Sequence, residues 1–464
     1  MKDKNLHLLW RCGFGPDFSL ISDIETLTEK QLWSKIKNNA AIALPSLTAS
    51  NSFVQNNYDK ITDRRLSKEE KAEWNKKIRF QSAKDLKELN NNWIDLMTNS
   101  HNQLGEKMAF FWHHHFAIRH ANSFLQQDAI NIIRKYALGN FGDLLREVSK
   151  SGAMILSLNN QQNKKSSPNE NFAREIMELF AMGIGNYTEQ DIKEAARAFT
   201  GWSISREGRF EFKNEHHDNG QKTILGKTGN FNGDDVVDII LKHPQTSKFI
   251  VSKIYNYFVS GKADNQKITE LAASFAKDYN ILNLIDTIFN SDWFYNDNNI
   301  GIKIKTPIDL LVGIQRLSPF KPIDKKLQNQ LQKLLGQVLF HPPSIAGWRT
   351  DKNWLDSSTL MVRLQLPQIL SGNITISLKT KSDDDTNMGK TNIEDDVSIG
   401  NANNISFSEQ WKVFTRPLNE TAVTSLMIVT NVSNEKMEMI KTKANGNKNE
   451  FAIGLLSLPE YQLC

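Results

Sequence analysis

Residues 167–202 read SPNENFAREIMELFAMGIGNYTEQDIKEAARAFTGW, and the pattern of this segment is helical. Apolar side chains recur every three or four positions from Phe172 to Phe180, which is the spacing of an amphipathic helix with one buried side. Gly183 supplies a stop signal after the last apolar positions. The pattern therefore predicts a helix from about residue 170 to 182.

A second helix is predicted directly after this one. Thr188 and Asp191 resemble a capping box, with aspartate in place of the usual glutamate. The positions that follow carry an apolar stripe at helical spacing, formed by Ile192, Ala195, Ala196 and Phe199. We therefore expect residues 167–202 to fold as a helical hairpin.

The polar face of the first helix has two interpretations. Arg174 and Glu178 stand four residues apart, so this face can be a solvated surface that carries one ion pair. Glu175 and Glu178 also stand three residues apart, with Asn171 one turn earlier. That arrangement can aim two carboxylates and an amide at one point, and it predicts a candidate site.

Composition limits the classes of protein that fit. The chain has 464 residues, 39% of them hydrophobic, and no apolar run approaches the roughly 18 residues that a spanning helix needs. The net charge of +5 is small for this length and is not gathered into a stripe, so nucleic-acid binding is not indicated. The two cysteines, Cys12 and Cys464, stand at opposite ends and predict neither a disulfide framework nor a cysteine metal site.

The start of the chain gives an expectation about location. Residues 1–18, MKDKNLHLLWRCGFGPDF, contain only a three-residue apolar run before Arg11. A secretory leader needs a longer apolar region, so the sequence as given predicts a cytoplasmic protein.

Residues 104–120, LGEKMAFFWHHHFAIRH, form the most histidine-dense segment. A buried imidazole needs a hydrogen-bond partner, a metal ion or an ion pair, so His113 and His115 are candidate metal ligands. They lie about 200° apart on a helix and can face one metal only if the helix ends, bends or unwinds there. The alternative is that they are core or capping histidines that donate to backbone carbonyls.

A short β-hairpin insertion is expected near 209–226, with strands at RFEF (209–212) and KTILG (222–226). The turn between them carries His217 and Asp218, which are competent to contact a metal or a phosphate. Exposed histidines are also common without any such role.

The rest of the chain predicts a mainly α protein, a multi-helix globular body with helices at 3.6 periodicity after residue 234. We expect a single helical body over 1–373, with a sub-boundary near 203–233. A flexible insertion is expected over 374–405, because residues 380–405 are rich in Asp, Asn, Ser and Gly. The helices of 406–464 are expected to dock back on the body.

Several phrases in fixed order make the chain similar to a known family. KMAFFWHHHF, NENFAREIMELFAMGIGNYTEQD, ARAFTGW, HDNGQKTILG, GQVLFHPPSIAGW and LLSLPEYQ resemble the bacterial family of unknown function DUF1800 over nearly the whole chain. The resemblance supports the helical fold and names no activity. It also implies a cell-envelope or periplasmic location, and a sulfatase-like protein encoded nearby as a partner.

The resemblance places three family motifs on numbered positions. Its Trp-His-x-His-Phe motif falls on Trp112, His113, His115 and Phe116. Its Asn-Glu-Asn-x-Ala-Arg-Glu motif falls on Asn169, Glu170, Asn171, Ala173, Arg174 and Glu175. Its His-Asp pair with the following lysine falls on His217, Asp218 and Lys222.

Three functions remain open at this point. The first is a metal-dependent hydrolase, in which mixed imidazole and carboxylate ligands hold zinc, manganese or iron and lower the pKa of a bound water to about 7. The second is a non-catalytic partner or binding protein with a buried polar network. The third is a metal-free glycan-active enzyme with a carboxylate pair and tryptophans as sugar platforms.

The candidate residues divide into three groups. The catalytic group is Glu175, Glu178 and Arg174. The metal group is His113, His115, His217 and Asp218. The substrate-binding group is Asn171, Lys222, Trp202 and Trp348.

Overall fold

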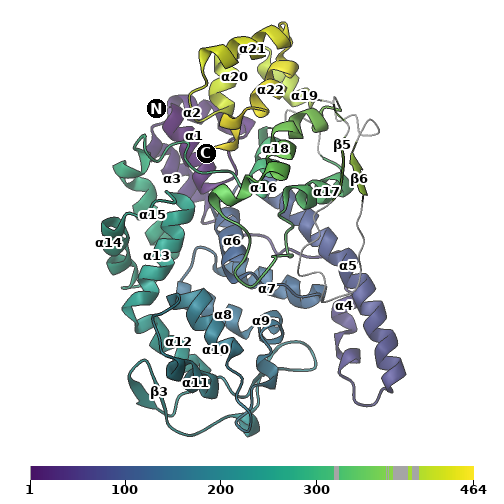
Figure 1. Ribbon diagram of the computed structural model, residues 1–464, viewed down its shortest axis with the longest axis vertical. Helices are drawn as coiled ribbons and strands as arrows, with labels where there is room; N and C mark the ends of the chain where they lie inside the picture. The colour runs from purple at the N-terminus through teal and green to yellow at the C-terminus, as the bar shows by residue number, and fades with distance from the viewer. Residues whose placement is uncertain (1, 318–322, 373, 375, 380–395, 400–406) are drawn as a thin grey trace.

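The computed structural model describes residues 2–317, 323–372, 374, 376–379, 396–399 and 407–464. The expected mainly α fold is confirmed, and the described strands form two-stranded antiparallel pairs only. Figure 1 shows the helices in chain order by colour.

The chain begins with the helices α1 (Lys2–Cys12), η1 (Phe18–Leu20), α2 (Ile21–Thr26), α3 (Glu29–Asn39), α4 (Phe53–Asn56), η2 (Tyr58–Ile61), α5 (Lys68–Asn99), α6 (Gln103–Phe116), α7 (Ser123–Tyr136), α8 (Phe141–Lys150), α9 (Gly152–Ser157) and η3 (Asn160–Gln162). The long helix α5 reaches out to one side of the molecule with α4 beside its outer end (Figure 1).

The middle of the chain forms α10 (Asn171–Glu175), η4 (Ile176–Met182), α11 (Glu189–Ala198), β1 (Trp202–Ile204), β2 (Phe210–Phe212), η5 (Asn214–His216), β3 (Lys222–Ile224), β4 (Lys227–Gly229), α12 (Gly233–Lys242), α13 (Pro244–Phe258), α14 (Asn265–Phe275), α15 (Ile281–Asn290) and η6 (Asp292–Tyr295). The capping box at the start of α11 is confirmed: the Thr188 side chain accepts from the Asp191 N–H, and Asp191 accepts from the Thr188 N–H.

The last part forms α16 (Pro307–Leu317), α17 (Lys325–Leu335), η7 (Asp351–Trp354), α18 (Ser357–Leu370), β5 (Ile376–Lys379), β6 (Asp396–Ile399), α19 (Glu409–Thr415), α20 (Glu420–Met427), α21 (Asn434–Ala444), α22 (Lys448–Leu456) and η9 (Pro459–Gln462). Most of the expected polar insertion, residues 380–395 and 400–406, lies outside the described residues.

The β insertion is where the sequence predicts it, but its strands pair differently. β2 pairs with β1, which precedes it, and β3 pairs with β4, which follows it. The predicted pairing of 209–212 with 222–226 is therefore wrong. Gly208 and Gly226 have φ of +78° and +75°, a conformation that glycine adopts without a steric cost, and each allows a tight turn next to its own strand.

Two apolar clusters fill the interior. The larger one surrounds α6 and takes residues from α3, α5, α7–α9, the helical hairpin and α12–α15. The smaller one joins Leu6 and Trp10 of α1 to α16–α18 and the C-terminal helices. The last helices thus dock on the body through this second cluster, close to α1 (Figure 1). The limits expected for the domains stay predictions.

None of the helices that the structure describes is long and apolar enough to cross a membrane. This agrees with the expectation from the sequence that the chain has no spanning segment.

Candidate functional site

The helix that carries the candidate carboxylates is built in two parts. α10 has ordinary α-helical winding, and η4 continues the chain as a π-helix. The predicted extent of 170–182 is thus close to the observed one, whereas the sequence analysis did not foresee the π winding. π-Helical turns are rare and occur frequently at functional sites, because the wider turn re-aims the side chains that follow.

The approach to α10 is fixed by asparagines. The Asn171 side chain donates to the Leu158 carbonyl at 3.2 Å, and the Asn171 N–H donates to Asn169 Oδ1 at 3.0 Å. The Asn169 N–H in turn donates to Asn163 Oδ1 at 2.9 Å. Asn171, predicted to bind substrate, therefore holds the preceding loop against the helix start.

Glu175 is the unusual carboxyl of this helix. The structure describes five buried acidic side chains: Asp63, Asp85, Glu106, Glu175 and Asp309. The other four accept hydrogen bonds or pair with cations. The Glu175 side chain is 8% exposed, and its carboxyl makes no hydrogen bond or ion pair with any described residue, although its oxygens are not among the fully enclosed polar atoms.

The surroundings of Glu175 favour its protonated form. Burial raises its pKa first, and the neighbouring Glu178 carboxylate raises it further, whereas Arg174 opposes the shift. A buried carboxyl without a donor resists ionisation because nothing replaces the water it has lost. Glu175 is therefore available as a proton donor closer to neutral pH than an ordinary glutamate.

The second carboxylate of the pair has a partner. The Tyr187 hydroxyl donates a hydrogen bond to Glu178. Tyr187 comes from the glycine-rich turn after η4, and burial together with this bond raises its pKa. Tyr187 was not among the site residues predicted from the sequence. Two glycines with positive φ, Gly183 and Gly185, return the chain beside Glu178, and GIGNY was the signal for that return.

Arg174 is held by two carboxylates other than the one predicted. It donates to both oxygens of Glu189, at 2.9 and 2.7 Å, and to Glu170 at 3.1 Å. The expected surface pair with Glu178 is replaced by this bidentate bond to α11. Arg174 thus ties the two helices of the hairpin together at their polar edge.

His115 contacts the π-helix directly. Its Nε2 lies 3.0 Å from the Phe180 carbonyl, and a carbonyl only accepts, so Nε2 carries the proton and Nδ1 is the free base. Nδ1 is buried and has no partner among the described groups. Burial lowers the pKa of His115 to about 3, so the ring is neutral at physiological pH.

His113 faces the opposite direction. Its Nε2 accepts from the Phe340 N–H at 3.2 Å, and its ring packs against Trp93, Phe340 and Trp348. Burial lowers its pKa to about 3 as well. The two histidines therefore bind different parts of the chain, as their separation on one helix predicts.

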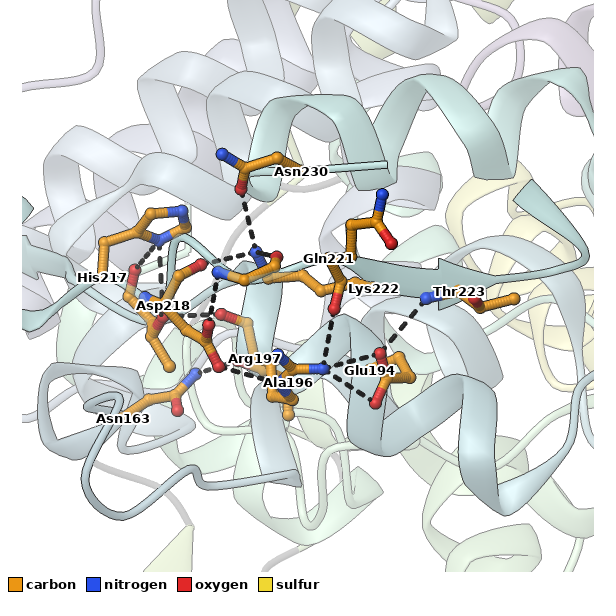
Figure 2. Close-up of polar contacts among 12 residues, drawn as sticks. Asn163, Glu194, Ala196, Arg197, His217, Asp218, Gln221, Lys222, Thr223 and Asn230 are labelled. Atoms are coloured by element: carbon orange, nitrogen blue, oxygen red, sulfur yellow. Dashed lines mark hydrogen bonds and ion pairs between the residues drawn. The ribbon is translucent and has the colours of Figure 1, made fainter. Parts of the chain in front are cut away.

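His217 and Asp218 belong to a network of polar contacts between α11 and the β insertion, which Figure 2 shows. His217 Nδ1 donates to the Thr200 carbonyl at 2.9 Å. Arg197 Nε donates to Asp218 Oδ2 at 2.7 Å and holds the pKa of that carboxyl below its usual value. Arg197 also pairs with Glu194 of α11 at 2.9 Å. Arg197 and Glu194 were not among the site residues predicted from the sequence.

The buried Lys222 side chain hydrogen-bonds to the same turn. It is 1% exposed, and its ammonium donates to the carbonyls of Asp218 and Gly220 at 2.5 and 3.0 Å. Burial lowers its pKa. The turn also needs Gly201, which has φ of +83° and whose absent side chain leaves room for the Lys213 carbonyl, 2.6 Å from where a Cβ would lie. The Lys222 ammonium thus hydrogen-bonds to protein carbonyls.

The residues expected to bind a metal are not brought together as a ligand set. Within the part of the chain that the structure describes, no group of three or more His, Cys, Asp or Glu side chains is arranged to hold a metal ion. His113 and His115 hydrogen-bond to Phe340 and Phe180, and His217 to Thr200. Among the described residues, these side chains therefore do not form one ligand set.

The two tryptophans of the substrate-binding group are core residues. Trp202 is 2% exposed and packs on Phe199 and Phe210, and Trp348 is 5% exposed and packs on His113. Neither ring offers an open face for a sugar.

Comparison with known proteins identifies relatives by family only. A family model described as "Protein of unknown function (DUF1800)" matches residues 7–463, which confirms the resemblance seen in the sequence. No curated protein and no solved structure matches the chain. Function therefore has to be argued from the geometry above.

Proposed function

The chain belongs to the DUF1800 family, whose description assigns no activity, and we propose that it is a hydrolase in which Glu175 transfers the proton. The observation that carries the proposal is the Glu175 side chain, which is 8% exposed and whose carboxyl makes no hydrogen bond or ion pair to any described residue, while its oxygens are not among the fully enclosed polar atoms. A carboxyl whose pKa is raised by burial and by a neighbouring carboxylate is a candidate for a functional site. Proton transfer is the chemistry that a carboxyl with a raised pKa performs.

The two glutamates divide the work of acid–base catalysis. Glu175, whose pKa is raised, gives its proton to the leaving group of the substrate, and the Glu178 side chain, oriented by Tyr187, is the base that accepts a proton from the attacking water. Two neighbouring carboxyls in different surroundings take opposite protonation states for this purpose. Arg174 is already paired with Glu170 and Glu189, and its charge opposes part of the rise in the pKa of Glu175.

A metal-dependent version of the hydrolase receives less support. The mixed ligand set that it requires is not assembled by His113, His115, His217 and Asp218 among the described residues. We therefore assign the activation of water to the carboxyls and derive no step through zinc, manganese or iron.

The protonation of Glu175 can be tested without knowing the substrate. We expect a ¹³C NMR titration of glutamate-labelled protein to show one carboxyl that titrates above the ordinary value of 4.5 and that disappears in Glu175→Gln. In a screen of phosphate, sulfate and carboxylic esters, glycosides and peptides, kcat should fall about 10²- to 10⁴-fold in Glu175→Gln.

Exposed Glu435 on α21 gives the matched control for this experiment. Glu435→Gln should leave both the raised titration and any turnover unchanged. A Glu175 signal that titrates at or below 4.5, or a Glu175→Gln variant with full turnover, would contradict the proposed role.

The same substitution is expected to stabilise the fold at neutral pH. The folded state holds the Glu175 proton more tightly than the unfolded state does, so stability is greatest below the unfolded pKa and declines as pH rises through the folded pKa. Glu175→Gln removes this decline and should raise the free energy of unfolding at pH 7 by about 0.5–2 kcal/mol. Urea unfolding of the wild type and the variant at pH 4 and pH 7 measures this difference in the free energy of unfolding. If the free energy of unfolding depends on pH in the same way in the wild type and the variant, Glu175 has the same pKa in the folded and the unfolded state, and the prediction is wrong.

A second candidate is a non-catalytic binding or partner protein. The observation in its favour is the network of His217, Asp218, Lys222 and Arg197, in which protein groups satisfy the polar atoms that the site hypothesis needs free. A sulfatase-like partner, suggested by the family, and a cytoplasmic or envelope location belong to this proposal as well. Co-purification with the neighbouring gene product would test it.

A further inference from the structure

Lys305 is enclosed by two aromatic rings far from the carboxyl pair. Its ammonium lies 3.6 Å from the centre of the Trp10 ring and 3.7 Å from that of Tyr461, and it donates to the Tyr461 carbonyl at 2.6 Å. The Lys305 side chain is fully buried. Such a position stabilises a cation through the ring faces but removes it from water.

Arg363 of α18 lies in the same place. It is also fully buried, and its Nε donates to Gln462 Oε1 at 3.1 Å while its Nη2 donates to the Lys305 carbonyl. The Lys305 N–H in turn donates to the Gln462 carbonyl at 2.8 Å. We refer to Trp10, Lys305, Arg363, Tyr461 and Gln462 as the donor cluster. It joins α1, α18 and η9. In Figure 1, α1 and α18 lie in the upper part of the molecule, and α10 lies in the lower part.

The donor cluster holds more donors than the protein satisfies. Its buried polar side-chain atoms without a partner among the described groups are Trp10 Nε1, Arg363 Nη1, the Tyr461 hydroxyl and Gln462 Nε2. Each of these can donate, and only the hydroxyl can also accept. Arg11, next to Trp10, adds two more such atoms, Nε and Nη1. Buried native donors are normally paired, so a surplus in one place calls for an acceptor.

Positive charge is in surplus at the same place. Lys305, Arg363 and Arg11 form no ion pair among the described residues, and Asp309 is already paired with Lys107 at 2.6 Å. Burial lowers the pKa of Lys305 to about 7, and the coulombic effects of Cys464 and Asp309 offset only part of that shift. An uncompensated buried cation is costly, and a bound anion removes the cost.

We propose that the donor cluster binds a small tetrahedral oxyanion, inorganic phosphate or sulfate. Guanidinium, ammonium, indole and amide groups are donors that such an anion accepts from simultaneously. The burial of all five side chains, none more than 3% exposed, restricts the ligand to a small anion rather than a phosphate group on a larger molecule. The site is separate from the proposed hydrolase chemistry and stands without it.

Two measurements on the full chain test the site. Protein purified in phosphate, desalted and then denatured should release about one phosphate per chain in a colorimetric assay. Protein prepared in Tris chloride should gain thermal stability at pH 6 as phosphate or sulfate is added, and potassium chloride at equal ionic strength should not raise Tm. Comparison of the phosphate and sulfate curves identifies the preferred anion.

Variants separate the donor cluster from general salt effects. Arg363→Gln should weaken the anion effect at least about tenfold in apparent Kd. Arg316→Gln should keep it, because Arg316 is equally buried but donates to Gly15, Thr98 and Asp17. Gln462→Glu places a carboxylate beside Arg363, and it should raise Tm in chloride and abolish the response to phosphate.

The proposal is overturned if the wild-type protein releases no anion and unfolds at the same temperature in phosphate, sulfate and chloride. A Gln462→Glu protein that keeps the full phosphate response would overturn it as well. Since that variant adds an acceptor to the cluster, it remains informative even if Arg363→Gln does not fold.

Discussion

Lowering the pH from 7 to 5 is expected to remove about 4 kcal/mol from the free energy of unfolding through two buried histidines, His113 and His115. Both rings are neutral in the folded protein, with pKa values of about 3 against 6.5 for an ordinary histidine. The unfolded chain binds protons as pH falls below 6.5, whereas the folded chain does not. Stability is therefore lost progressively between pH 6.5 and pH 3.

The size of the expected stability loss follows from the lowered pKa of each histidine. One pKa unit corresponds to about 1.4 kcal/mol, and pH 5 lies about 1.5 units below the ordinary value, so each ring contributes about 2 kcal/mol. Guanidinium unfolding at a series of pH values between 4 and 7 measures the slope. His113→Gln keeps an acceptor for the Phe340 N–H, and it should reduce the slope by the contribution of one proton.

The exposed residue His101 provides the control. His101→Gln should leave the slope between pH 4 and pH 7 unchanged. If His113→Gln and His115→Gln also leave it unchanged, the two imidazoles titrate in the folded state and our account of their burial is wrong.

The second large effect is expected at Glu106, inside the larger apolar cluster. Glu106 is fully buried and accepts hydrogen bonds from Arg134 and from Trp93 Nε1, the latter at 2.9 Å. Glu106→Gln keeps the shape but removes the charge, which leaves the 3%-exposed Arg134 without its counter-ion. We expect a loss of about 3–5 kcal/mol in the free energy of unfolding, as for other broken buried pairs.

The same chemical change at a surface pair is the matched comparison. Glu73 and Lys77 form an i,i+4 pair at 2.6 Å on the exposed side of α5. Because solvent screens that pair, Glu73→Gln should change stability far less than Glu106→Gln. Equal effects of the two substitutions in urea unfolding would show that Arg134 is neutralised by another group.

Local patterns in the sequence predicted most of the secondary structure. The apolar spacing from Phe172 to Phe180, the stop at Gly183 and the capping box at Thr188 each depend on neighbours within four residues. Those interactions are fixed by the chain itself, so the helical hairpin and the mainly α fold were predictable. The pairing of β2 was not, because β1 is only three residues long, shorter than the runs of about four to eight residues that indicate a strand.

The candidate site was predictable only in part. Sequence spacing placed Glu175 and Glu178 on one helix, but the raised pKa of Glu175 depends on burial, and the hydrogen bond to Glu178 depends on Tyr187, and no local rule supplies either. The same limit applies to Lys222 and Trp348, which look like ligand-binding residues in the sequence and are buried in protein contacts.

Sequence alone thus determined the helices, the family and the short list of chemical groups, because these follow from residue identity and short-range periodicity. Tertiary structure alone decided which of those groups are satisfied by the protein. Polar atoms lose water when distant segments meet, so whether a buried donor or carboxyl finds a partner depends on contacts between residues far apart in the chain. That is why Glu175 and the donor cluster around Lys305 emerge only from the folded chain.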